Sequence, residues 1–178
     1  MDALTHIFLP LILIYVLKRE YFNPNPLVFS LALFALLPDV DKFLGMSGLL
    51  HSLLTLVPTL AASFLLERKL SGTKRYSLII TFFVLTHLLL DFLGDGIVPL
   101  LYPLVKSGVG LRYPIQIVFG EGSLGAMIRG SIEITKTAPE PGFHAYESLI
   151  TGYGVAASLV FLTIFVKDRL RGRSEGEG

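Results

Sequence analysis

Long apolar runs, separated by short polar or proline- and glycine-rich segments, cover most of this 178-residue chain. There are five such runs, at residues 3–17, 27–37, 49–66, 76–93 and 148–166. The last three approach the roughly 20 residues that a helix needs to cross the hydrocarbon of a bilayer, whereas the first two are shorter. The pattern predicts an all-α polytopic integral membrane bundle with four to five spanning helices.

Residues 94–147 depart from this pattern, because glycine and proline are frequent there and the apolar patches are short. Residues 131–135 alternate like a strand, but five residues are too few to decide the structure. We expect an irregular extracytoplasmic loop region, which could act as a lid on a single domain of residues 1–166. Residues 167–178 are basic and rich in glycine, which predicts a disordered cytoplasmic tail.

Composition supports a membrane protein, since 52% of the residues are hydrophobic and only 16% are charged. The net charge of +1 gives no reason to expect a nucleic-acid partner, and the lack of cysteine excludes disulfides and thiolate metal sites. Basic residues gather at one side if all five runs cross: two follow the first run, four follow the third and four lie in the tail. The positive-inside rule then puts the N-terminus outside and the C-terminus in the cytoplasm.

This topology brings all four histidines and several carboxylates to the extracytoplasmic face. The topology rests on the basic residues alone, so the convergence of the histidines supports a shared site independently. The candidate residues are His6, Asp39, Asp41, His51, His87, Asp91, His144 and Glu147. Within this set His87 and Asp91 are four residues apart, so they share one face of a helix. Ionisable groups inside an apolar run are costly and indicate a functional site.

Imidazole and carboxylate ligands without thiolate suit zinc, with manganese as the alternative. A set of this size could hold one to three ions, and a bound divalent ion lowers the pKa of its water to about 7. A carboxylate that is not fully used as a ligand, Asp39 or Asp41, could then act as the general base. The residues thus favour a metal-dependent hydrolase.

Several short motifs resemble the YdjM-type family of predicted membrane-bound metal-dependent hydrolases. They are Thr5-His6, Leu37-Pro38-Asp39-Val40-Asp41, Leu50-His51-Ser52, His87-Leu88-Leu89-Leu90-Asp91 and Gly96-Ile97-Val98-Pro99-Leu100. Together they cover about residues 1–105. The chain departs from the family at residues 46–47, where a His-Arg pair is common, and at Leu50, which replaces a threonine.

That family is in turn similar to the zinc-dependent phospholipase C and single-strand nuclease superfamily of helical enzymes. The resemblance implies metal-ligand roles for His6, Asp39, His51, His87 and Asp91, with Asp41, His144 and Glu147 as further candidates. It also implies a phosphoester substrate, either a small molecule or a lipid head group. The expected location is the plasma or inner membrane, in contact with its lipids.

Other interpretations of the same residues remain open. His87 and Asp91 could be a hydrogen-bonded pair that packs helices together, and Asp39 and Asp41 could be turn residues. His144 and Glu147 could be structural, and Arg112 and Arg129 could meet a substrate phosphate or simply face solvent. In function, the alternatives are a membrane protein that binds or moves metal ions or protons without catalysis, and a helical scaffold or regulatory protein.

Overall fold

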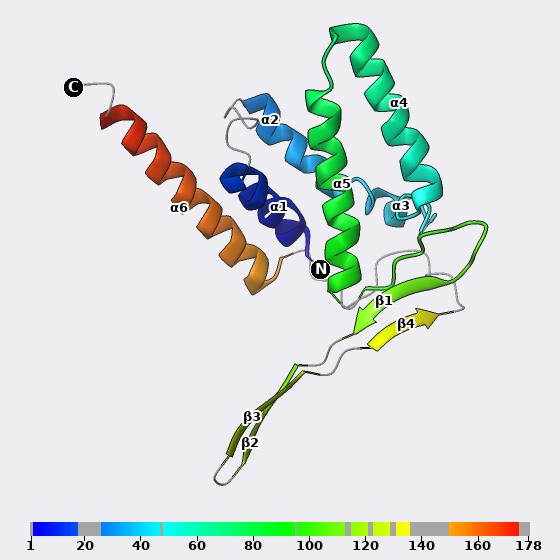
Figure 1. The fold of residues 1–178 in the computed structure, drawn as a ribbon, viewed down its shortest axis with the longest axis vertical. Helices are drawn as coiled ribbons and strands as arrows, with labels where there is room; N and C mark the ends of the chain where they lie inside the picture. Colours follow the sequence, from blue (N-terminus) through cyan, green and yellow to red (C-terminus); the bar gives the residue numbers. More distant parts are fainter. Residues whose placement is uncertain are drawn as a thin grey trace.

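A computed structural model describes residues 2–17, 26–46, 48–94, 96–112, 115–120, 123–128, 131–135 and 150–174 (Figure 1). The fold is mostly helical. Its helices are α1 (Ala3–Leu17), α2 (Pro26–Ser30), the 3-10 helix η1 (Leu31–Leu36), α3 (Val40–Phe43), α4 (Leu53–Ser71), α5 (Arg75–Leu93) and α6 (Gly152–Ser174). Its strands are β1 (Gly108–Arg112), β2 (Ile115–Gly120), β3 (Ser123–Ile128) and β4 (Ser131–Thr135).

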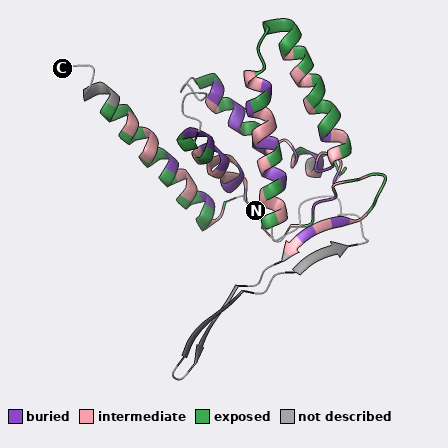
Figure 2. Ribbon diagram, viewed as in Figure 1, coloured by how far each residue is buried: buried purple, intermediate pink, exposed green. Residues whose placement is uncertain are grey.

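Helix α5 is the central element, since η1, α1, α4 and β1 all pack against it (Figure 1). Phe83, fully buried on α5, belongs to a core that also includes Leu11 of α1, Ala35 of η1 and Phe161 of α6. A second, smaller core joins α5 to α4 and to the segment after α5, through Leu56, Val84, Leu88 and Val98. Figure 2 shows buried stretches along α1, the α2–η1 segment and α5, whereas α4 and α6 are largely exposed.

The second apolar run is not one regular helix, as its sequence suggested, but α2 followed by the tighter η1. In a 3-10 helix, residues three apart lie on the same face. This aligns Ala32 and Ala35, which are 2% and 0% exposed, so that the backbone of η1 can approach its neighbours closely. The tight turn then leads through Pro38 directly to Asp39 and Asp41.

The all-α prediction is wrong for β1, β2, β3 and β4, which are antiparallel strands where an irregular loop was expected. β1 pairs with β4, and β2 pairs with β3. Because β2 and β3 lie between β1 and β4 in the sequence, the order of pairing is that of a hairpin. The β2–β3 pair lies farthest from the helices (Figure 1). The alternating pattern at 131–135 does mark a strand, β4. Its partner β1 has the sequence Gly-Val-Gly-Leu-Arg, which alternates too weakly to be identified without the pairing.

The third run becomes helical only at Leu53, because Ser52 caps the helix. The Ser52 hydroxyl accepts a hydrogen bond from the Leu54 N–H at 3.2 Å and lies 3.2 Å from the Leu100 carbonyl, to which it donates. The Leu53 N–H also donates to that carbonyl, at 2.9 Å. The segment after α5, which contains the Gly96–Leu100 motif, therefore holds the start of α4 and the residue just before the cap, His51.

Replacing Ser52 with alanine should lower the free energy of unfolding by about 1–2 kcal/mol, since both the cap and the bond to Leu100 are lost. Thermal unfolding of the detergent-solubilised protein measures this change. Ser158→Ala is the matched control, because its exposed hydroxyl only donates to the carbonyl of Val155 within α6. Equal stability of the two variants would contradict the role given to Ser52.

The end of the chain also differs from the expected tail, because α6 continues as far as Ser174. Residues 175–178 lie outside the described part of the chain. Among the residues described, one helix, α5, is long and apolar enough to cross a membrane by length and composition. Helices α4 and α6 are as long, but each ends in a charged stretch, Glu67–Lys69 in α4 and Lys167–Arg169 in α6.

Candidate metal centre

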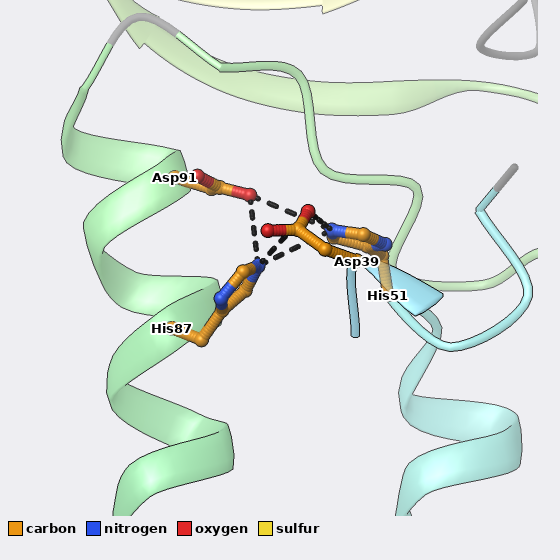
Figure 3. A group of neighbouring side chains, drawn as sticks. All are labelled: Asp39, His51, His87 and Asp91. Atoms are coloured by element: carbon orange, nitrogen blue, oxygen red, sulfur yellow. Dashed lines mark hydrogen bonds and ion pairs between the residues drawn. The ribbon is translucent and has the colours of Figure 1, made fainter. Parts of the chain in front are cut away.

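Four of the predicted ligands converge on one point near the last turns of α5 (Figure 3). His87 and Asp91 project from α5, Asp39 lies at the start of α3, and His51 precedes α4. Each offers one ligand atom, and these four atoms all lie within 4.8 Å of one another. The turn after η1 and the cap of α4 thus bring two distant motifs to the helical His–Asp pair.

The distances within this group fit one small ion. His87 Nε2 lies 3.2 Å from Asp91 Oδ2, 3.4 Å from His51 Nε2 and 3.7 Å from Asp39 Oδ1. His51 Nε2 lies 3.5 Å from Asp91 Oδ2 and 3.6 Å from Asp39 Oδ1. Tetrahedral ligands at ordinary zinc–nitrogen and zinc–oxygen distances are roughly 3.3–3.6 Å apart. The group could therefore hold a metal ion.

Asp41 lies behind His51 and outside the four-ligand group. Its Oδ2 accepts hydrogen bonds from the N–H groups of Gly48 and Leu50, both at 2.9 Å, and lies 3.2 Å from His51 Nδ1. A metal-binding histidine usually donates its second ring N–H to a carboxylate or carbonyl, which fixes the orientation of the ring. Asp41 is fully buried and occupies this supporting position.

His6 reaches the centre from α1 and contacts Asp91 from the other side. Its Nε2 lies 3.0 Å from Asp91 Oδ1, and its ring stacks on that of His87 at 4.0 Å with an interplanar angle of 24°. Its Nδ1 lies 3.1 Å from the Asp2 carbonyl, which can accept its N–H. His87 Nδ1 has no hydrogen-bond partner within the described part of the chain, so stacking on His6 helps to hold its ring.

Asp2 also joins α1 to the start of α6 beside this centre. Its carboxylate accepts hydrogen bonds from the Thr5 N–H at 3.1 Å and from the Thr151 hydroxyl at 2.6 Å. A Cβ atom on Gly154 would overlap the same carboxylate, so α6 can approach Asp2 only because glycine stands there. The start of α6 is thereby attached to the turn of α1 that carries His6.

The electrostatics of the centre favour a cation. Burial by itself lowers the pKa of the His51 imidazole, but hydrogen bonds to Asp39 and the other two aspartates raise this pKa to about 10. Burial likewise opposes ionisation of Asp39, yet the hydrogen bond from His51 and the nearby positive charges hold the pKa of Asp39 well below its usual range. Without a metal, the carboxylates therefore retain a proton on His51 as their counter-charge.

The structure thus brings together five predicted ligands, with four in one group and His6 beside it, and places Asp41 as a supporting residue. His144 and Glu147 lie outside the described residues, as does Arg129. Sequence reasoning missed Asp2 and Lys42, which contact His6 and Asp39. The position of Asp2 four residues before His6 was a usable signal, whereas nothing in the sequence distinguishes Lys42 from the other charged residues.

Comparisons with curated proteins and with solved structures find no match to either. A comparison with protein families gives a match over residues 1–167, which extends well beyond the motifs at residues 1–105. The matching family is described as YdjM inner membrane protein, as the resemblance of the motifs predicted. The chain belongs to this YdjM inner membrane protein family.

Proposed function

We propose that this protein is a metal-dependent hydrolase of the inner membrane that acts on a phosphoester. The observation that carries the proposal is the convergence of His51, His87, Asp39 and Asp91, with five interatomic distances of 3.2–3.7 Å. Two imidazoles and two carboxylates match the donor preferences of zinc, and manganese is the alternative. One ion fits the group, and His6 beside Asp91 is the candidate for a further ligand.

A divalent ion in such a site supplies Lewis acidity and activates water at neutral pH. The protein supplies positioning: Asp41 orients His51, and the stacked His6 orients His87. Asp39 is the more exposed of the two candidate bases, at 20% for its side chain against 0% for Asp41. This greater exposure supports Asp39 over Asp41 as the general base, a role that the sequence left open between them.

The proposed setting is a bundle of four to five membrane-spanning helices, with the centre near the extracytoplasmic surface. Exposed apolar side chains on the outer faces of the helices support contact with lipid, as on Leu54 and Val57 of α4, Leu85 of α5, and Leu159 and Leu162 of α6. The α4–α5 connection and the end of α6 carry basic residues and lie at the opposite end from the centre (Figure 1). The positive-inside rule then makes that opposite end cytoplasmic.

The experiment is metal-dependent cleavage of a generic phosphodiester, bis(p-nitrophenyl) phosphate, by the purified protein in detergent. We expect cleavage that a chelator abolishes and that added zinc or manganese restores. A protein that binds metal but cleaves no phosphoester would instead support metal or proton binding without catalysis. A protein that binds no metal would support the helical scaffold.

Metal uptake should release about one proton per ion at pH 7–8, because His51 carries a proton in the metal-free centre and must lose it to become a ligand. Affinity for zinc should accordingly rise with pH throughout the range below the His51 pKa. Titration calorimetry in buffers with different ionisation enthalpies measures the released protons. Uptake without proton release would mean that His51 is already neutral in the metal-free centre, which contradicts the raised pKa of His51.

A further inference from the structure

Lys42 lies on the least buried side of the metal centre, next to Asp39. It lies on α3, three residues after Asp39, and its Nζ is 2.8 Å from Asp39 Oδ1. That oxygen is the same one that faces His51 Nε2 and His87 Nε2. The side chains of Lys42 and Asp39 are 21% and 20% exposed, whereas those of His51 and His87 are 7% and 0% exposed. The centre is therefore less deeply buried on the side where the ammonium group lies than on the side of the two histidines, although Asp39 Oδ1 itself is buried.

The charges around the centre show why a cation matters at this position. Asp39, Asp41 and Asp91 carry three formal negative charges, and a divalent ion leaves one of them uncompensated. An anionic substrate would approach a centre of net negative charge and would be repelled. The positive charge of the Lys42 ammonium compensates the remaining negative charge, and it lies on the less buried side of the centre, next to Asp39.

We propose that Lys42 binds an anionic oxygen of the substrate and thereby makes the centre selective for phosphate esters over neutral esters. The inference rests on the proposed function and names the group that recognises its substrate. A lysine ammonium is a compact charge with three donors on a flexible stem, so it can keep one hydrogen bond to Asp39 and direct another to a phosphoryl oxygen. Lys42 is thus a specificity-determining residue, whereas Asp39, Asp91, His51 and His87 hold the ion.

The test measures binding of inorganic phosphate to the zinc-loaded protein in detergent, by equilibrium dialysis, with zinc content determined on the same samples. Lys42→Met should weaken phosphate binding by about 10- to 100-fold, the usual effect of losing one hydrogen bond to a charged group. Its zinc content should match that of the wild type. Lys42→Arg should retain most of the affinity, because it keeps the charge. Lys69→Met, on an exposed position of α4, is the control for loss of a lysine and should bind phosphate normally.

Three results would overturn the inference: equal phosphate affinity of Lys42→Met and the wild type, loss of zinc from Lys42→Met, or a zinc-loaded wild type that binds no phosphate. Loss of zinc would make Lys42 a support of the metal ligands instead of a substrate contact. Wild-type protein that takes up no zinc or manganese contradicts the proposed function itself, and the inference falls with it. Zinc content thus distinguishes the two failures.

Discussion

Replacement of both His87 and Asp91 with alanine should abolish metal binding, with a loss of affinity of at least about 100-fold, and with it any metal-dependent hydrolysis. The pair supplies two of the four converging ligand atoms, His87 Nε2 and Asp91 Oδ2. Asp91 also contacts His6 and His51, so its removal disconnects the centre from α1 and α4 together. Bound metal, counted by elemental analysis after purification and dialysis, measures the effect.

The control for this variant is Asp168→Ala. Asp168 is a carboxylate on α6 that accepts a hydrogen bond from the Tyr15 hydroxyl at 2.9 Å, and it takes no part in the four-ligand group. The control should keep the metal content of the wild type, and circular dichroism should show that the double variant remains helical. Equal metal content in the double variant and the control would mean that His87 and Asp91 only pack helices together and do not bind the ion.

The second large effect is expected at Asp41. Asp41→Ala leaves the buried N–H of Gly48 and the half-buried N–H of Leu50 without their acceptor and frees the ring of His51. Unsatisfied buried donors cost about 1–3 kcal/mol each, so the free energy of unfolding should fall by about 2–5 kcal/mol. Loss of the group that orients a ligand typically lowers metal affinity by about 10- to 100-fold.

Asp41→Asn separates these two effects. The side-chain carbonyl oxygen of asparagine can still accept hydrogen bonds from the loop N–H groups, but the negative charge that faces His51 is lost. This variant should recover most of the thermal stability in detergent while its zinc affinity stays below that of the wild type. If zinc affinity is unchanged in both variants, Asp41 supports the loop alone and not the metal ligands.

The sequence was a good guide to the centre because its ligands belong to short motifs. The spacing of His87 and Asp91 placed both on one helical face, and the charge of the loops brought His6, Asp39 and His51 to the same end. The sequence could not predict that Asp39 joins the four-ligand group whereas Asp41 supports the loop and His51. This difference depends on the path of the chain between α3 and α4, where the N–H groups of Gly48 and Leu50 turn toward Asp41.

The sequence was a weaker guide to the fold outside the helices. The four strands depend on pairing between segments that alternate poorly, such as Gly108–Arg112, and pairing is not a local property of a sequence. The division of the second run into α2 and η1 depends on the close packing of Ala32 and Ala35, which a count of apolar residues does not reveal. The Asp2–Thr151 bond likewise joins residues at opposite ends of the chain.

The most direct measurement of the central claim is X-ray absorption at the zinc edge of the zinc-loaded protein. The arrangement of His51, His87, Asp39 and Asp91 predicts scattering from two imidazole rings, with nitrogen and oxygen ligands at about 2.0–2.2 Å. A third imidazole would appear if His6 also binds the ion. A spectrum without imidazole scattering would contradict the account, since the ion would then lie somewhere other than the end of α5.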